Sequence, residues 1–493
     1  MKSKFRFVAF LLALLMTGSL LVSCGETAEN SEENLPDSAV QSNSVTENPE
    51  AVPEEEETRP PLSLDVSTLD FGGEELVSAV YNWQGYLSYF FADEYTGDSM
   101  NDAIYSRRIK TEEALNISMR TDRYSELDYI SQIKKLFMAG DHAFDLMFNH
   151  CIQDIATYVS EGYLYNLDLL PNIDTQAQWW DREQMDNLRL GKNTYYAVND
   201  MMIPAPYLIT FNKDMITDNH LDSPYQLVYE GRWTLDAFTS LAKSVVRDLD
   251  GNGEMDKNDQ WGFIKGGSAN LSFMVGAGQF LTGRDADNRV ILTMNTEKMQ
   301  SLVEIFADLS ATATYFSPSG DDRMILNDGK SLFDMISLGV AEQLRDYDVN
   351  VGILPYPKYD EAQAEYMNMD WGGLLSVSGL ITNPDMVGAA MEFLAWDSAN
   401  EVIPAYFDLL LAGKLARDED DRKMLDLIFE TIVYDNGANY FGFSQGVEPL
   451  FYTLMRLAIE QQSTDYASHY AANEKMANKS IETFYKKLEK IEG

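Results

Sequence analysis

Short apolar runs and amphipathic stretches alternate along the chain after residue 70. Residues 76–80, 117–119 and 144–148 form apolar runs typical of buried strands, and residues 102–115 and 129–138 show helical spacing. This alternation predicts an α/β fold with a parallel sheet, because parallel neighbours need a crossover that a helix supplies. We expect a ligand site at the carboxyl ends of these strands.

Residues 233–263 carry the strongest local signal, which predicts a helix, an acidic loop and a strand. Thr234 is placed to cap the helix, and Asp236 lies in the first turn, where the helix dipole favours negative charge. An apolar stripe at helical spacing is formed by Leu235, Phe238, Leu241, Ala242, Val245 and Val246. Residues 260–264, after the loop, are expected to form a strand.

The acidic loop matches the spacing of a calcium-binding loop. Oxygen ligands in such loops recur at positions 1, 3, 5, 7, 9 and 12, with glycine at position 6 for the sharp turn. Gly253 falls at position 6, and the ligand positions hold Asp248, Asp250, Asn252, Glu254, Asp256 and Asp259. Asp259 is a methylene shorter than the usual glutamate, and the sequence offers no second loop. We therefore expect a structural Ca²⁺ ion rather than a sensor; the alternative is an acidic surface turn without an ion.

The first 24 residues are typical of a secretory signal. Lys2, Lys4 and Arg6 form a basic start, an apolar stretch follows to about Val22, and the segment is too short for a permanent span. Its end, LVSCG, resembles the lipobox of bacterial lipoproteins, in which the cysteine, here Cys24, is lipidated. This resemblance implies a protein anchored by acyl chains to the extracytoplasmic face of a bacterial cell membrane. The alternative is an ordinary signal peptide with an incidental cysteine.

The charge of the chain excludes some classes of partner. Residues 25–62 are rich in Ser, Asn, Pro and acids, which predicts a disordered spacer. The net charge is −42, and removing residues 1–62 still leaves 68 acidic against 33 basic residues. So acidic a body argues against nucleic acid and against anionic membrane surfaces, which leaves the lipid anchor as the expected membrane contact. The chain has two cysteines, Cys24 and Cys151, so no disulfide framework is expected if Cys24 is lipidated.

Several segments of the sequence resemble segments of family 1 of the extracellular solute-binding proteins of ABC sugar importers, particularly of its large lipoprotein members. The segments, in family order, are AGDHAFDL at 139–146, YLITFNKD at 207–214, the helix and acidic loop after Trp233, NDGKSLF at 327–333 and GILPYPKY at 352–359. Each segment alone is weak, but together they span most of the chain after residue 70.

The resemblance implies a two-lobed periplasmic-binding-protein type II fold with the ligand cleft between the lobes and a helical C-terminal region. We expect residues 63–207 and about 330–380 in lobe 1, and residues 208–329 and 381–493 in lobe 2. A helix is expected to start at Asn383 and Pro384. The implied partners are a carbohydrate, expected to be an oligosaccharide, and the permease of an ABC importer. We expect a monomer.

Candidate ligand contacts follow from topology rather than from a matched motif. Aromatic rings stack on the apolar faces of sugars, and planar polar groups bond their hydroxyls. Such groups at strand ends, at the lobe crossing and in the C-terminal region are Trp83, Gln84, Asn149, His150, Tyr207, Trp371 and Tyr440. Each aromatic could instead be a core residue. Cys151 is expected to be a buried free thiol, although a position facing the cleft stays open.

Two other functions fit parts of the sequence. A cell-surface adhesion or scaffold module stabilised by calcium would also use an acidic spacer and a lipid anchor. A secreted polysaccharide-acting enzyme is less favoured, because the sequence contains no G-x-S-x-G, no H-E-x-x-H and no phosphate-binding glycine loop. We therefore expect a binding protein without catalytic residues.

Overall fold

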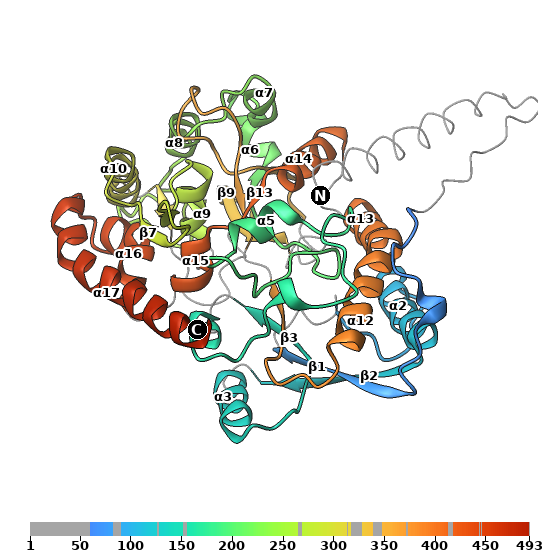
Figure 1. The fold of residues 1–493 in the computed structure, drawn as a ribbon. Coiled ribbons are helices and arrows are strands. Elements are labelled where there is room, and N and C mark those ends of the chain that lie inside the picture. The colour runs from blue at the N-terminus through green and yellow to red at the C-terminus, as the bar shows by residue number, and fades with distance from the viewer. Residues whose placement is uncertain are drawn as a thin grey trace, which may run out of the picture.

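A computed structural model describes residues 60–81, 90–125, 128–150, 155–264, 269–312, 314–316, 328–338, 348–370, 373–412, 418–442, 444 and 446–492. Two mixed sheets, each covered by helices, form two lobes (Figure 1). The predictions for Cys24, Trp83, Gln84, Cys151 and Trp371 lie outside these residues.

The first sheet has the strand order β12-β3-β1-β2. Its strands are β1 (Glu74–Tyr81), β2 (Ile117–Tyr124), β3 (Leu146–His150) and β12 (Gly373–Val377). β1 is parallel to both neighbours, and β12 joins β3 in the antiparallel sense. The helices between these strands are α2 (Ser99–Leu115), α3 (Tyr129–Ala139) and α4 (Ile155–Ser160). The alternation predicted for residues 76–148 is confirmed.

The second sheet has the order β10-β4-β9-β5-β8. Its strands are β4 (Tyr207–Asn212), β5 (Trp261–Ile264), β8 (Tyr315–Phe316), β9 (Ser331–Ser337) and β10 (Val351–Leu354). β4 runs antiparallel to β9 and β10, whereas β5 is parallel to β8 and β9. Two-stranded pairs are formed by β6 (Thr282–Arg284) with β7 (Val290–Leu292) and by β11 (Asn368–Met369) with β13 (Ile432–Val433).

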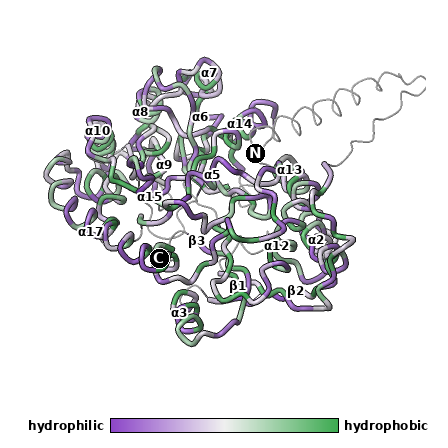
Figure 2. The backbone as a smooth tube through the Cα atoms, in the orientation of Figure 1, coloured by the Kyte–Doolittle hydropathy of each residue, from purple (hydrophilic) through white to green (hydrophobic). Residues whose placement is uncertain are grey.

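The remaining helices cover the two sheets. They are α5 (Arg182–Asn187), α6 (Lys213–Asp218), α7 (Pro224–Tyr229), α8 (Leu235–Ser244), α9 (Ala269–Gly276), α10 (Glu297–Ala311), α12 (Pro384–Asp397), α13 (Ile403–Ala412), α14 (Glu419–Glu430), α15 (Asn436–Phe441), α16 (Glu448–Phe451) and α17 (Tyr466–Glu492). Short 3-10 turns span Val66–Thr68 and Leu167–Leu169, and π-helical turns span Ser398–Val402 and Leu454–Glu460. Figure 2 shows hydrophilic and hydrophobic positions alternating around these helices, as expected when one face packs on a core.

The sheet pairings place the lobe boundaries differently from our expectation. β9 and β10, expected in lobe 1, pair with β4 in the second sheet. α12 and α13, expected in lobe 2, pack against α2 beside the first sheet. The chain returns to the first sheet only at β12, because two strands after residue 330 complete the second sheet first.

The helix caps predicted at Thr234 and Asn383 are present in the structure. Thr234 Oγ1 accepts a hydrogen bond from the Ala237 backbone N–H at 3.4 Å, and the α8 stripe is buried. α12 begins at Pro384, and Asn383 Oδ1 accepts from the Met386 N–H at 3.2 Å. Among the described residues, no helix combines the length and the apolar character needed to cross a membrane.

Candidate functional site

The carboxyl ends of two parallel strands of the first sheet lie at one edge. β1 ends at Tyr81 and β3 ends at His150, which pairs with Gly373, the first residue of β12. In open α/β sheets, ligands bind in the crevice outside such ends. This edge is therefore one wall of the candidate site.

The second sheet presents a matching edge. β5, β8 and β9 are parallel and end at Ile264, Phe316 and Ser337. Tyr207, the first residue of β4, pairs with Ser337 at the same edge. The same topological rule makes this edge the opposite wall.

Asp370 joins the two edges at the crossing between the lobes. It is 1% exposed, and its carboxylate accepts from the Ala205 backbone N–H at 3.1 Å and from the Tyr434 hydroxyl at 2.6 Å. Pro206 forms a bridge with Asp370 and directly precedes β4, while Gly373 follows Asp370 by three residues. The first residues of β4 and β12, one at each strand-end edge, therefore lie within a few residues of one buried carboxylate or of its bridge partner. Asp370 was not among the residues expected in the site, although it directly precedes Trp371 in the sequence.

Asn149 is a core residue in the structure. Its side chain is 1% exposed, donates from Nδ2 to Ser376 Oγ at 2.8 Å and accepts at Oδ1 from the Tyr129 hydroxyl at 3.0 Å. Its amide groups thus tie β3 to β12 and α3. The geometry gives Asn149 a structural role rather than the ligand contact expected from its position.

His150 lies at the strand-end edge and is half-buried. Desolvation by burial lowers its pKa from 6.5 to about 4, so the ring is neutral near neutral pH. A neutral imidazole both donates and accepts hydrogen bonds, which suits a polar contact with a saccharide hydroxyl.

Stability should depend on pH through His150. Its pKa is lower in the folded state than in the unfolded chain, so its contribution to stability is complete above pH 6.5 and is lost as the pH falls toward 4. Urea unfolding at about pH 7.5 and about pH 5 should show a smaller loss for His150→Gln than for the unmodified protein. Equal losses in the two proteins would contradict the lowered pKa of His150.

The two tyrosines expected in the site differ in exposure. Tyr207 is partly exposed at the start of β4, on the second edge. Tyr440 is 2% exposed, its hydroxyl donates to the Leu188 carbonyl at 2.9 Å, and its ring packs edge-on against Tyr196 at 5.6 Å. Tyr440 is therefore a packing residue, and it offers no open face for stacking.

Trp83, Gln84 and Trp371 remain candidates by their place in the chain. Trp83 and Gln84 follow the end of β1 by two and three residues, and Trp371 precedes β12 by two. All three are thus neighbours in sequence of described residues at the first edge.

The acidic loop between α8 and β5 gathers part of the expected ligand set. Asp248, Asp250 and Asp259 each offer an oxygen, and these atoms lie within 4.8 Å of one another. Gly253 has φ +85°, the left-handed conformation that the sharp turn requires. Hydrogen bonds to its carboxylate lower the pKa of Asp248 and keep it charged, and the bond from the Gly253 N–H has the largest effect.

The rest of the expected ligand set bonds within the loop. Asn252 Oδ1 accepts from the Glu254 N–H at 2.6 Å, and Asp256 Oδ1 accepts from the Asn258 N–H at 2.7 Å. Three clustered carboxylates fit a hard cation such as Ca²⁺, and the Glu254 carbonyl is the backbone ligand expected at position 7.

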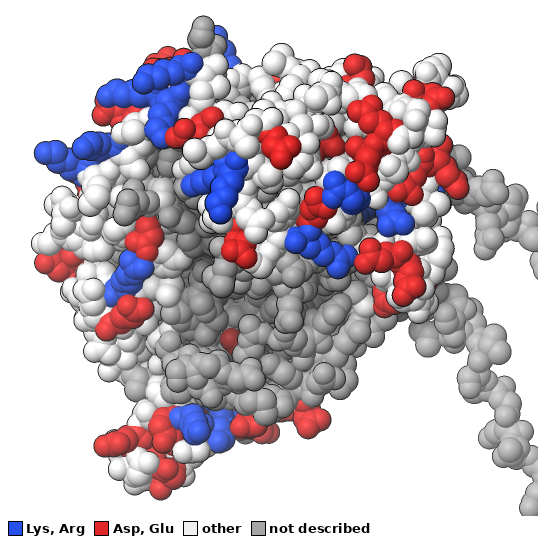
Figure 3. All heavy atoms as spheres, turned by 90° about the horizontal axis from the view of Figure 1, so that it is seen from below, with Lys and Arg blue, Asp and Glu red and all other residues white. Residues whose placement is uncertain are grey.

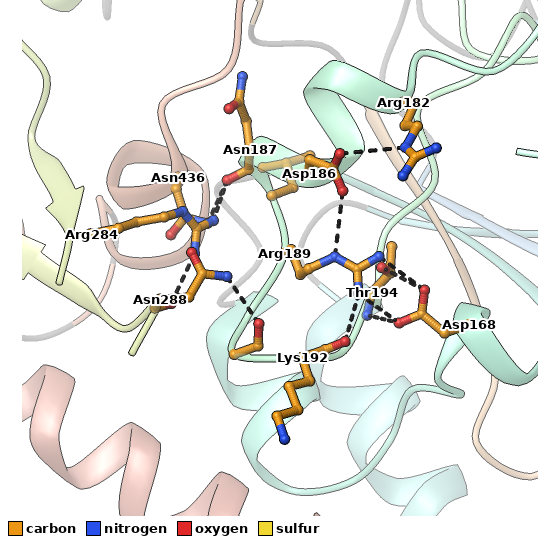
Figure 4. A network of polar contacts seen from close by, with 12 residues as sticks. Asp168, Arg182, Asp186, Asn187, Arg189, Lys192, Thr194, Arg284, Asn288 and Asn436 are labelled. Carbon is orange, nitrogen blue, oxygen red and sulfur yellow. Dashed lines mark hydrogen bonds and ion pairs between the residues drawn. The ribbon is translucent and has the colours of Figure 1, made fainter. Parts of the chain in front are cut away.

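A second polar network joins the lobes (Figure 4). The Arg284 guanidinium donates to the Asn187 carbonyl, Asn436 Nδ2 donates to the same oxygen at 2.9 Å, and Asn288 Nδ2 donates to the Gly191 carbonyl at 2.9 Å. The receiving segment begins at the last residue of α5 and belongs with the first sheet, because its continuation at Ala197 forms a bridge with Leu375 of β12. Relative motion of the lobes must therefore carry this segment along or break these bonds.

No protein-family model matches the sequence, and no curated protein matches it either. Solved structures do match. A cyclo/maltodextrin-binding protein complexed with maltotetraose has a TM-score of 0.58 and 16% identity, over 83% of this chain and 98% of its own. An ABC substrate-binding protein from Listeria monocytogenes, in complex with cycloalternan, has a TM-score of 0.54 and 13% identity, over 84% and 98%. The GacH receptor of Streptomyces glaucescens, studied with acarbose, has a TM-score of 0.53 and 14% identity, over 85% and 99%. The chain thus has the two-lobed α/β fold of the sugar-binding proteins of ABC transporters, as the sequence resemblance predicted.

Proposed function

We propose that this chain is a family 1 solute-binding protein that captures an oligosaccharide between its lobes and delivers it to the permease of an ABC importer. The observation that carries the proposal is the meeting of two strand-end edges at the Asp370 crossing, in a fold shared with binding proteins for maltotetraose and cycloalternan. Hinged closure over the ligand is the motion that such a fold supports.

A thermal-shift screen against neutral and acidic oligosaccharides tests this function. A ligand that binds only the folded state stabilises it, by about 2.7 kcal/mol at a concentration 100-fold above Kd. At least one saccharide should therefore raise the melting temperature and be recovered intact. Recovery of shortened products would instead support the enzyme, and no shift with any saccharide would support a scaffold.

We also propose that the acidic loop binds Ca²⁺ as a structural ion. Saturating Ca²⁺ should raise the melting temperature, because the folded loop gathers three carboxylates that the unfolded chain does not hold together. The double variant Asp248→Asn with Asp250→Asn should lose this increment and keep its saccharide affinity. Asp287→Asn, an exposed acid outside the loop, is the matched control. Identical melting curves with Ca²⁺ and with chelator would reject the site.

The lipid anchor is the third element of the proposal. The LVSCG sequence supports processing before Cys24 and acylation of its thiol. Cys24→Ala should accumulate as an unprocessed precursor or as a soluble secreted form, measured by fractionation of the expressing bacterium. Normal maturation with full membrane retention in this variant would end the lipoprotein proposal.

A further inference from the structure

A groove runs along the contact between α4 of the first lobe and the C-terminal helix α17. Its volume is about 430 Å³, within the ~300–1,000 Å³ common for small-molecule sites. Hydroxyls and ammonium groups line both sides: Thr157, Ser160, Lys479, Ser480, Thr483 and Lys487. No part of the proposed calcium loop or of the Asp370 crossing lines the groove.

The two walls of the groove connect differently to the lobes. α4 follows β3 of the first sheet, whereas α17 packs both on α4 and on α10 and β7 of the second lobe. The Tyr466 hydroxyl donates to the Met294 carbonyl at 2.6 Å, and the Tyr485 hydroxyl accepts from the Val290 N–H at 2.8 Å. α17 runs from the side of α10 and α16 toward the C-terminus, where Lys487 pairs with Glu161 beside α4 (Figure 1). A molecule in the groove therefore contacts both lobes.

The charge of the groove opposes that of the chain. Among the described residues that line it, two are lysines and none is acidic, in a chain with 79 acidic and 37 basic residues. Figure 3 shows that charge is unevenly distributed on the face seen from below, with Lys and Arg gathered toward the upper left and Asp and Glu at the upper right. Lys487 is paired with Glu161, so among the described residues that line the groove Lys479 is the ammonium group placed to meet an anion.

Two hydroxyls of the groove are oriented to accept hydrogen bonds. Thr483 Oγ1 donates to the Lys479 carbonyl at 2.7 Å, and Ser444 Oγ donates to the Phe441 carbonyl at 2.8 Å. In these two residues the hydroxyl hydrogen is used, which leaves oxygen lone pairs for the hydroxyls of a ligand. The lysines supply the complementary donors.

Apolar surface is also present for the face of a ring. Phe441 and Phe484 are buried and pack edge to face at 5.1 Å. Met476 lies at the groove and is 55% exposed, so its side chain adds accessible apolar surface there. Polar and apolar groups together match the amphipathic surface of a sugar ring.

We infer that this groove binds an anionic sugar unit of the saccharide ligand, with a hexuronate carboxylate against the Lys479 ammonium group. The inference rests on the proposed function and narrows its ligand class to saccharides that carry a carboxylate. Since the bound hexuronate would touch both lobes, its binding would favour the relative position of the lobes in which the groove is formed.

Calorimetric titration of the Ca²⁺-loaded protein tests the inference with hexuronate-containing oligosaccharides and their carboxyl-reduced counterparts. The acidic form should bind roughly 3- to 30-fold more tightly than the reduced form. The lower bound is the gain in affinity expected from an exposed ion pair, and the upper bound is that expected from a charge-assisted hydrogen bond. Lys479→Gln should remove this preference, and Thr157→Glu, on the opposite wall, should reverse it. Lys475→Gln, an exposed lysine of α17 outside the groove, should keep it.

Each outcome has a defined meaning. Equal affinity for the acidic and reduced forms, or a preference that survives Lys479→Gln, would overturn the groove site and leave the proposed function standing. Failure of every saccharide to bind would overturn both. Raised ionic strength should shrink the preference if it is electrostatic.

Discussion

Replacing Asp370 by alanine is expected to lower the free energy of unfolding by roughly 2–6 kcal/mol, because two buried donors lose their acceptor at about 1–3 kcal/mol each. Those donors are the Ala205 N–H and the Tyr434 hydroxyl. Chemical denaturation measures the loss. Because the same carboxylate connects the crossing segments, saccharide affinity should fall as well.

Two control variants separate the loss of the buried hydrogen bonds in Asp370→Ala from the loss of a negative charge and from the change in side-chain shape. Asp222→Ala removes an exposed aspartate of the second lobe and should change stability little. Asp370→Asn retains an oxygen acceptor for Ala205, and its Nδ2 can donate to the tyrosine oxygen, so the loss should be smaller. Unchanged stability of Asp370→Ala would contradict the role of Asp370 as the junction of the crossing.

Truncating Trp83 or Trp371 to alanine should weaken saccharide binding by roughly 30- to 1,000-fold. An aromatic platform in a desolvated site is worth about 2–4 kcal/mol on truncation, at about 1.4 kcal/mol per decade. Both residues lie two positions in sequence from a strand end, Trp83 after Tyr81 of β1 and Trp371 before Gly373 of β12. Titration calorimetry measures the change in affinity, and ligand-free melting should be nearly unaffected.

Trp233 provides the opposite control. It is fully buried, and its indole Nε1 donates to the Pro355 carbonyl at 2.9 Å. Trp233→Ala should cost about 3–5 kcal/mol of folding stability with or without ligand. If Trp83→Ala and Trp371→Ala behave like Trp233→Ala, losing stability and retaining affinity, both are core residues and the site must be sought elsewhere.

Local structure was predictable from the sequence because its causes are local. The strands at β1, β3 and β5 follow from apolar runs, and the starts of α8 and α12 follow from Thr234 and Asn383, whose caps close within three residues. The three-carboxylate cluster of the acidic loop likewise follows from spacing within twelve residues.

The remaining features depend on partners far apart in the chain. Asn149 is drawn into the core by Ser376, 227 positions away, and Tyr440 by Leu188, 252 positions away. The lobe boundary differs from the expected one because β9 and β10 pair antiparallel with β4. Strand propensity alone does not specify which strands pair. The groove likewise forms only where α17 meets α4.

Capture of an oligosaccharide is tested by calorimetric titration of the protein lacking residues 1–24 with the oligosaccharide found in the thermal-shift screen, followed by chromatography of the saccharide. We expect saturable one-to-one binding, loss of affinity in Trp371→Ala with unchanged ligand-free melting, and recovery of the saccharide intact. Cleavage of the saccharide, or the absence of a binding isotherm for any saccharide at calcium saturation, would contradict the proposed function.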